Sequence, residues 1–287
     1  MTPRDRDLER KLFVVTGGSS GIGAATVTAL VSRGATVAAS FRDERRMEAV
    51  AERARAQGGE VLPFPLDLEK PASIRSFAES VKRIGRPVDA LVQNAGVVYR
   101  RERRTEEGLD AQQAVIHFGP LLLTRLLVDA FARPARVVDV VSDLHARVTA
   151  ADLDREPPYH FIRSYAIAEL RKILVSRELA RRLASRGVDV NCVHPGGVRT
   201  RLFRDVGGPL GLLFTAAQVL RMSPEAAARG VVHAACDLPA GTTGRYLANG
   251  WFGVRFGRPS RLAEDDALAR RIYEEDCLRT GLTPVSA

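Results

Sequence analysis

Cysteine is scarce in this chain, and the few cysteines form no pattern. The 287 residues include Cys192, Cys236 and Cys277, whose spacing matches neither a disulfide framework nor a metal-ligand motif. Cys192 lies in an apolar run, where a thiol usually acts as a small buried hydrophobe. We therefore expect neither disulfides nor a cysteine-bound metal to hold the fold together, and no metal site is predicted.

Long apolar runs and lysines are scarce as well. No run of about eighteen apolar residues occurs, and the charged start MTPRDRDLERKL lacks an apolar signal segment, so we predict a cytoplasmic protein without a membrane span. The net charge of +9 comes mostly from arginine, because only Lys11, Lys70, Lys82 and Lys172 are lysines. The arginines are interspersed with acids, as in RELARRLASR, and this distribution argues against a nucleic-acid partner.

Short apolar segments alternate with longer amphipathic ones along the whole chain. This order is typical of repeated βαβ units, and segments that are apolar on both sides, such as LFVVT, fit a parallel sheet covered on both faces. We predict an α/β fold: a Rossmann-type doubly wound parallel sheet in three α/β/α layers. It forms a single domain over residues 11–287, after an N-terminal extension at 1–10. A Gly-Gly-Pro hinge suggests a substrate lid at 201–225, although a plain surface helix explains that segment equally well.

The apolar periodicity also predicts where the elements begin and end. Strands are expected at 11–18, 36–42, 60–68, 88–96, 136–143 and 188–197. Helices are expected at 19–34, 43–59, 71–85, 109–131 and 165–186.

The glycine-rich stretch TGGSSGIG, residues 16–23, lies between the first predicted strand and the first helix. Gly17 permits a tight turn, Gly21 lets the backbone approach a diphosphate, and Gly23 lets the helix pack closely on the strand. The helix N-terminus offers unpaired N–H groups and a partial positive charge to phosphates. This arrangement predicts a dinucleotide cofactor.

The end of the second strand indicates which dinucleotide is bound. A site that prefers NAD has an acid here for the ribose hydroxyls, whereas this chain reads SFRDE, with Arg42 at the strand end and Ser40 two residues earlier. A guanidinium matches a 2′-phosphate, so NADP(H) is predicted over NAD(H), although Asp43 follows directly. Asp67 could accept a hydrogen bond from the adenine amino group, or it could cap the next helix.

Further motifs carry a resemblance to a known family. The motifs QNAG at 93–96 and HPGGVRT at 194–200, together with the glycine motif, resemble the short-chain dehydrogenase/reductase (SDR) family. The stretches TEEGLDAQQAVIHFGPLLLT and TGRYLANG are similar to its retinol-dehydrogenase-like branch. The likeness runs from about residue 11 to near the C-terminus. It implies a nicotinamide-dependent oxidoreductase, and a homodimer or homotetramer built through the helices at 109–131 and 165–186.

In this family, the QNAG motif lines the adenosine side and stabilises the central sheet, and HPGGVRT holds the nicotinamide. With the residues argued above, the predicted cofactor-binding set is Gly17, Ser19, Ser20, Gly21, Ile22, Gly23, Arg42, Asp67, Leu68, Asn94, Ala95, Gly96, Pro195, Gly196, Val198 and Thr200.

The resemblance also implies a catalytic set of Ser, Tyr, Lys and Asn. Ser142 matches the serine that polarises the reacting oxygen, and Tyr165 matches the tyrosine that exchanges a proton with it. Glu169 occupies the position of the lysine, which would lower the tyrosine pKa, and Ile116 that of the asparagine, which anchors a water chain. The candidate catalytic residues are therefore Tyr165, Ser142 and Glu169, in an altered set.

A carboxylate one helical turn from a tyrosine disfavours the phenolate, so alcohol oxidation should suffer more than carbonyl reduction. Lys172 is too far along the helix, at about 10.5 Å from Tyr165, to replace the missing ammonium, and its spacing suits a pair with Glu169. Asp139 and Asp143 bracket Ser142, which predicts an unusually acidic site. Tyr159 and Arg163 copy the Tyr-to-cation spacing, but Pro157 and Pro158 just before them indicate a loop.

Three functions stay open on the sequence alone. The leading prediction is an NADP(H)-dependent reductase of an apolar carbonyl or imine. The second is an enzyme of the same fold that catalyses a non-redox step, such as dehydration, cyclisation or isomerisation in secondary metabolism, with Glu169 as acid or base. The third is a non-catalytic NADP-binding protein. Glu169 could also simply accept hydrogen bonds from the ribose hydroxyls.

Overall fold

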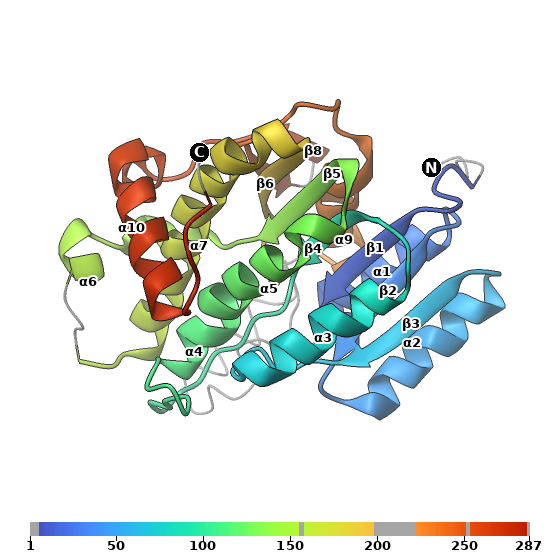
Figure 1. Cartoon of the computed structure of the whole chain (residues 1–287), viewed down its shortest axis with the longest axis horizontal. Coiled ribbons are helices and arrows are strands. Elements are labelled where there is room, and N and C mark those ends of the chain that lie inside the picture. The colour runs from blue at the N-terminus through green and yellow to red at the C-terminus, as the bar shows by residue number, and fades with distance from the viewer. Residues whose placement is uncertain (1–5, 155–157, 198–221, 251–252, 286–287) are drawn as a thin grey trace.

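One twisted sheet runs through the molecule (Figure 1). The structure, a computed structural model, describes residues 6–154, 158–197, 222–250 and 253–285. In these residues eight strands have the order β3-β2-β1-β4-β5-β6-β7-β8, parallel except for the last pair. The strands are β1 (Leu12–Thr16), β2 (Thr36–Phe41), β3 (Glu60–Pro65), β4 (Val88–Gln93), β5 (Phe131–Val140), β6 (Val188–His194), β7 (Tyr246–Gly250) and β8 (Gly253–Phe256).

Helices cover both faces of this sheet, which confirms the predicted α/β class and its three layers (Figure 1). On one face lie α1 (Gly21–Val31), α2 (Glu44–Ala56) and α9 (Pro224–Val232). On the other lie α3 (Pro71–Arg83), α5 (Gly119–Leu127), α7 (Phe161–Leu183) and α10 (Asp266–Arg279). Two short helices, α4 (Ala111–Gln113) and α6 (Ala150–Asp154), complete the α-helices of the described residues.

Apolar side chains on both sides of each central strand explain the two layers of helices. All five residues of β1 are buried, with Phe13 and Val15 in one core cluster and Leu12 and Val14 in the other. Such a strand is stable only if both of its faces are shielded from water. The strand order reverses between β1 and β4, and ligands of doubly wound sheets bind at the carboxyl ends of the strands at this point.

The region predicted as one helix over 109–131 is interrupted. A π-helical turn at Ala114–Phe118 separates α4 from α5, and β5 already begins at Phe131. Pro120, in the first turn of α5, has no N–H to donate to the preceding turn, so the regular hydrogen-bond ladder breaks there. The helix predicted at 165–186 begins earlier, at Phe161, and ends in a 3₁₀ turn at Ala184–Arg186.

The C-terminal helix α10 packs along α7, and buried polar groups fasten it there (Figure 1). Asp276 is fully buried and bonds His117 Nε2 at 2.7 Å and Arg171 Nη1 at 2.6 Å. The Tyr273 hydroxyl accepts from Arg125 Nη1 at 2.7 Å, which ties α10 to α5 as well. The chain's own α10 therefore covers part of the helical face through which the predicted oligomer would form.

Among the described residues, no helix combines the length and the apolarity needed to cross a membrane.

Candidate active site

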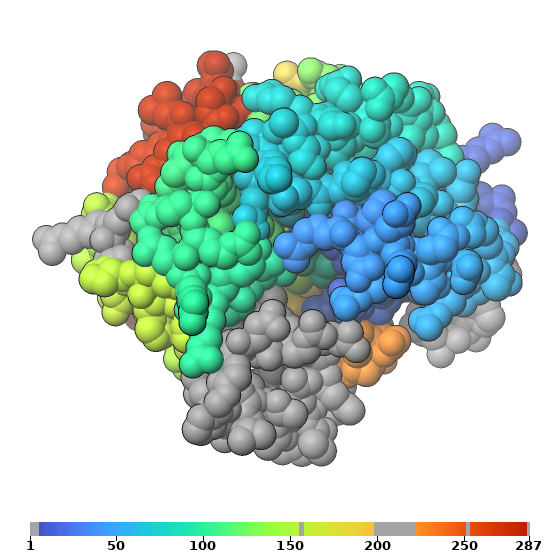
Figure 2. All heavy atoms as spheres, turned by 90° about the horizontal axis from the view of Figure 1, so that it is seen from below, coloured from blue at the N-terminus to red at the C-terminus, as the bar shows by residue number. Residues whose placement is uncertain are grey.

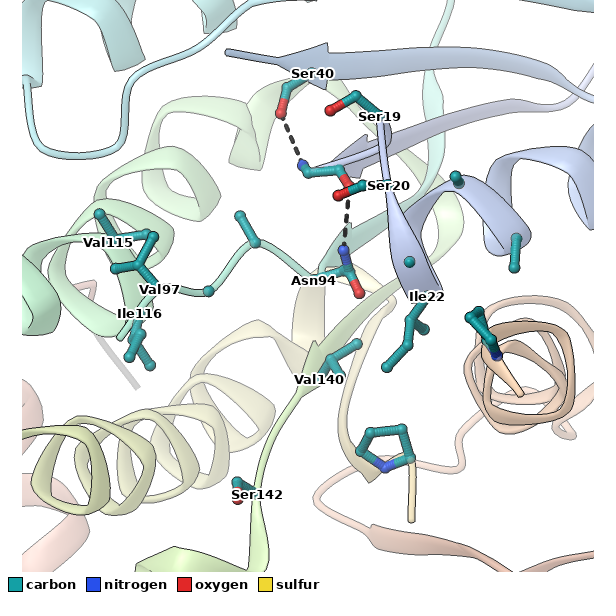
Figure 3. Close-up of a pocket in the computed structure, with 18 of the residues that line it drawn as sticks. Ser19, Ser20, Ile22, Ser40, Asn94, Val97, Val115, Ile116, Val140 and Ser142 are labelled. Atoms are coloured by element: carbon teal, nitrogen blue, oxygen red, sulfur yellow. Dashed lines mark hydrogen bonds between the residues drawn. The ribbon is translucent and has the colours of Figure 1, made fainter. Parts of the chain in front are cut away.

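A large cleft opens along the carboxyl ends of the strands. Its volume is about 1850 Å³, and it extends from the turn after β1 to the end of β5, so that Ser40 and Ser142 lie toward opposite ends of it (Figure 3). Viewed from below, the blue N-terminal segments lie to one side of the molecule, and the green and yellow-green ones, up to about residue 160, lie to the other (Figure 2). The residues that line the cleft come from both halves of the sequence, from Gly17 to Glu225.

The turn after β1 is tightly built. Gly17 has φ +67 and Gly21 φ +54, values that favour glycine. A Cβ at Gly23 would lie 2.1 Å from the Gly17 carbonyl oxygen, so only glycine lets α1 start this close to β1. The Ser40 hydroxyl accepts from the Gly17 N–H at 3.0 Å and fixes the turn against β2 (Figure 3).

The turn fits a dinucleotide diphosphate. A Cβ added at Gly21 or Gly96 would meet no protein atom within 4 Å, so both backbones face open space. The first-turn N–H groups of α1 have no partner within the helix and can bind an anion. Of the predicted cofactor-binding residues, the cleft is lined by Gly17, Ser19, Ser20, Gly21, Ile22, Arg42, Leu68, Asn94, Ala95, Gly96, Pro195 and Gly196.

Arginines gather at the end of the cleft beside β2. Arg42, Arg46 and Arg53 line it together with Asp43. The Asp43 carboxylate caps α2 by accepting from the Arg46 N–H, and it also pairs with the Arg46 guanidinium at 2.9 Å. Asp43, the acid that argued against NADP(H), thus acts as the N-cap of α2.

The Asp67 carboxylate also accepts a hydrogen bond from the nearby backbone. Its Oδ1 accepts from the Glu69 N–H at 3.1 Å in the loop before α3, and its contact with adenine stays a prediction. The neighbouring side chains Leu66 and Leu68 line the cleft instead.

The QNAG and HPGG motifs follow β4 and β6, the two strands that flank β5. Asn94 Nδ2 donates to the Thr16 carbonyl at 3.1 Å and so joins β4 to β1. It also donates to the Gly17 carbonyl at 3.4 Å (Figure 3). Gly196 has φ +84, and a Cβ there would lie 2.7 Å from the Asn249 carbonyl oxygen. Two predicted cofactor residues, Val198 and Thr200, lie outside the described residues, as does most of the predicted lid, 201–221.

Ser142, Tyr165 and Glu169 meet at the far end of the cleft. Ser142 follows β5, and its N–H donates to Glu169 Oε2 at 3.0 Å. The Tyr165 hydroxyl is hydrogen-bonded to both the Glu169 carboxyl and Ser142. All three side chains line the cleft, although Tyr165 is only 6% exposed and Glu169 4%. The structure therefore brings together the three candidate catalytic residues.

The pKa values of this group follow from burial and charge. Burial raises the pKa of Tyr165 well above 10, and the nearby Glu169 carboxylate raises it further. Burial also raises the pKa of Glu169 above its usual 4.5, which Lys172 and the hydrogen bonds from Tyr165 and Ser142 only partly oppose. The tyrosine is thus held as a neutral phenol, the form that donates a proton.

Ile116 packs directly against this tyrosine. It is fully buried, in a small apolar cluster with Val98, Tyr165 and Ala168. The sec-butyl side chain of isoleucine offers no hydrogen bond to a water chain.

Lys172 does not form the expected pair with Glu169. Within the described residues its salt bridge is with Asp139, Nζ to Oδ1 3.7 Å, and Nζ also donates to the Gln93 and Val140 carbonyls at 3.0 and 3.1 Å. The ammonium is drawn toward the carboxyl ends of β4 and β5 because two carbonyls and a carboxylate converge there. The i,i+3 prediction was wrong because it considered the helix alone.

The expected acidic character of the site is also largely cancelled. Asp139 is buried beneath the site and paired with Lys172. Asp143 lines the cleft, but His194 Nε2 lies 3.0 Å from its Oδ2, and the Tyr246 hydroxyl donates to Oδ1 at 2.8 Å. The bond to His194 lowers the pKa of Asp143. Each acid that brackets Ser142 thus has a basic partner.

The alternative register at Tyr159 is not used. The Tyr159 hydroxyl donates to the Tyr99 backbone carbonyl, outside the Ser142 group. Residues that sequence reasoning missed include Arg46 and Arg53 at one end of the cleft. Only the fold reveals them, because no spacing rule links them to the motifs.

Comparisons with known proteins agree with this geometry. The family model described as short chain dehydrogenase matches residues 11–208. The chain is 33% identical to human retinol dehydrogenase 13, over 98% of this chain and 87% of that protein.

Solved structures are similar as well. A protein from Mycobacterium paratuberculosis superposes with TM-score 0.75 at 29% identity, covering 100% of both chains. A short-chain dehydrogenase from Burkholderia cenocepacia J2315, solved in complex with NADP, has TM-score 0.69 at 26% identity, covering 84% of this chain and 96% of that one. The chain is an oxidoreductase of the short-chain dehydrogenase/reductase family, in its retinol-dehydrogenase-like branch.

Proposed function

We propose that the protein is an NADP(H)-dependent reductase of an apolar carbonyl or imine, with Tyr165 as the proton donor and Ser142 polarising the reacting oxygen. The observation that carries this proposal is the contact of the Tyr165 hydroxyl with both Ser142 and Glu169 at the end of the cleft. Glu169, in the place of a cation, keeps the phenol protonated. Reduction consumes that proton, whereas alcohol oxidation needs the phenolate.

The choice of NADP(H) rests on the charges beside β2. Arg42, Arg46 and Arg53 line that end of the cleft, and Asp43 is occupied as the cap of α2. Guanidinium groups suit a 2′-phosphate, and similar proteins have been solved with NADP or NADPH bound. When bound, the reduced nicotinamide supplies a hydride.

An apolar substrate suits the lining near Ser142. Val97, Ile116, Leu144 and Ile162 all line the cleft there. The curated relatives are named retinol dehydrogenases, so long polyene aldehydes belong in the first substrate panel. Cyclic imines and aliphatic ketones complete it.

The test is NADPH oxidation by the purified protein with this panel, followed by the loss of nicotinamide absorbance. Tyr165→Phe should reduce turnover at least ~100-fold while leaving NADPH binding unchanged, because only the donated proton is lost. Tyr159→Phe, which removes a tyrosine hydroxyl outside the Ser142 group, is the matched control and should keep activity. An active Tyr165→Phe variant would refute the assignment of the donor.

A second candidate is a non-redox reaction on the same fold. It is favoured by Glu169, a buried carboxyl in contact with Tyr165, since such a pair could move protons without a hydride. Product formation with no change in nicotinamide absorbance would select it. Nucleotide binding without any turnover would select the third reading, a non-catalytic NADP-binding protein. The predicted homo-oligomer and cytoplasmic location stay predictions.

A further inference from the structure

Two buried carboxyl groups share one buried ammonium beneath the candidate active site. Asp139 is 2% exposed, Glu169 4% and Lys172 3%. Two buried carboxylates facing a single ammonium would leave an uncompensated buried charge, which is costly. The group is therefore most stable with one proton retained on a carboxyl.

The positions of the donors indicate which carboxyl keeps the proton. Lys172 Nζ donates to the Gln93 and Val140 carbonyls, and within the described residues its salt bridge is with Asp139, at 3.7 Å. The Ser176 hydroxyl lies 2.6 Å from Asp139 Oδ2 and also 2.6 Å from the Lys172 carbonyl, so its single proton serves only one of them. Glu169 has the Ser142 N–H and the Tyr165 hydroxyl, but no salt bridge with Lys172 among the described residues. The charge of Lys172 thus stabilises Asp139 first.

The hydrogen bond between Tyr165 and Glu169 leads to the same assignment. A phenol has a single proton. When Tyr165 directs that proton toward a substrate oxygen, its contact with Glu169 persists as a hydrogen bond only if the carboxyl supplies the proton.

We propose that Glu169 is protonated in the resting protein and re-protonates Tyr165 after each reduction. Lys172, held by Asp139, is a positioning residue. Because its charge stabilises the Asp139 carboxylate, the proton stays on Glu169. The inference rests on the reductase function proposed above. The charged and titratable groups that face Glu169 are Tyr165 and Lys172 from α7, Asp139 from β5, Asp143 after it, Cys192 and His194 from β6, and Tyr246 from β7.

The proton steps balance. The phenolic O–H of Tyr165 breaks as the O–H or N–H of the reduced substrate forms. The carboxyl O–H of Glu169 then breaks as the phenol is restored, and the Ser142 N–H stabilises the resulting carboxylate. Glu169 finally recovers a proton from water in the cleft. This path needs no asparagine-anchored water chain, which agrees with Ile116 at that position.

The first test uses infrared spectroscopy on the full chain without added nucleotide, and so does not depend on activity. The wild type should show the C=O band of a protonated carboxyl at neutral pH. Glu169→Gln should lose this band, and Asp139→Asn should keep it. A wild type without the band, or a band that disappears in Asp139→Asn and persists in Glu169→Gln, would overturn the inference.

The second test uses the pH dependence of the reduction rate, once the panel above has identified a substrate. Asp139→Asn frees the charge of Lys172 to stabilise the Glu169 carboxylate, so the alkaline fall in kcat should move about one unit lower in pH. Lys172→Met should move it in the opposite direction, and Glu169→Gln should remove it while lowering kcat roughly tenfold at unchanged KM.

A merely structural defect has no reason to move the pH profiles of Asp139→Asn and Lys172→Met in opposite directions. Shifts of the same sign in these two variants, or no shifts, would therefore contradict the role of Lys172. If Lys172→Met does not fold, the pH profile of Asp139→Asn and the infrared spectra still test the protonation of Glu169. If no substrate is reduced at all, the proposed function fails, but the infrared result still judges the protonation of Glu169.

Discussion

At the scale of single residues, the proposed preference for reduction depends on Glu169. The carboxyl lies in contact with the Tyr165 hydroxyl, where it disfavours the phenolate. A tyrosine kept neutral can donate a proton, but it accepts one poorly. In the proposed reaction, the electrostatic interaction between Glu169 and Tyr165 therefore favours reduction over alcohol oxidation.

Glu169→Lys should shift this preference. A cation beside Tyr165 lowers the pKa of the phenol, so alcohol oxidation at neutral pH should rise roughly tenfold relative to reduction for each unit of that shift. The measurement is the ratio of oxidative to reductive kcat/KM, with Glu169→Gln as the control that places an uncharged amide at this position. An increase of less than a few fold would show that the charge at this position does not govern the tyrosine.

The raised pKa of Glu169 also makes stability depend on pH. The folded protein holds this proton above pH 4.5, the usual pKa of glutamate, whereas the unfolded chain releases it there. The contribution of Glu169 to the free energy of unfolding is thus fully present below about 4.5 and is lost as the pH rises through the folded-state pKa. Glu169→Gln should therefore become more stable relative to the wild type between pH 5 and pH 8, as measured by urea unfolding.

Glu178→Gln provides a control of opposite sign. Burial tends to raise the pKa of Glu178, but its bonds to Arg181 and Arg182 lower it overall. That carboxylate stabilises the fold above the unfolded-state pKa, so its replacement should cost relatively more as the pH rises. Parallel pH trends in the two variants would contradict the assignment for Glu169.

At the scale of elements, the end of β2 and the start of α2 line the same end of the cleft, where the cofactor is proposed to bind. Arg42→Ala should weaken NADPH binding about 10- to 100-fold, since it removes charge-assisted hydrogen bonds worth about 1.5–3 kcal/mol, and should leave NADH binding nearly unchanged. Asp43→Asn is the control, because asparagine caps α2 as well as aspartate does. Titration of nucleotide fluorescence measures both. Equal losses for the two nucleotides would argue against recognition of the 2′-phosphate.

The attachment of α10 depends on one buried carboxylate. Asp276→Ala should lower the free energy of unfolding by about 3–5 kcal/mol, because it leaves the buried Arg171 guanidinium without its partner. Asp266→Ala, at the exposed end of the same helix, breaks a surface pair with Arg177 and should cost at most about 1 kcal/mol. Chemical denaturation compares the two. Similar costs would mean that the Asp276 network contributes little to the stability.

At the scale of the whole molecule, α10 changes where a predicted homo-oligomer could assemble. It lies against α7 and bonds α5, so an interface on that side must use its outer surface, where Leu278 is 76% exposed. We expect Leu278→Arg to lower the mass measured by light scattering. Phe256→Arg, on the edge strand β8, changes another exposed apolar residue, 63% exposed, and should leave the mass unchanged. A monomeric wild type would contradict the oligomer itself.

The sequence alone determined the architecture and the location of the site. Apolar segments such as LFVVT allow only a sheet covered on both faces, and the glycines at 17, 21 and 23 permit only one kind of turn. Helical spacing was sufficient to place Tyr165 and Glu169 one turn apart. These features are local, so residue type and periodicity contain the information.

Only the tertiary structure decided the partners of the charged side chains. Lys172 pairs with Asp139 rather than with Glu169, because carbonyls from β4 and β5 converge on its ammonium. Asp143, after β5, pairs with His194 at the end of β6. Likewise, Asp276 of α10 bonds His117, which lies 159 positions earlier in the chain. Electrostatic energies depend on distance and burial in three dimensions, and neither is encoded in the spacing of residues along a helix.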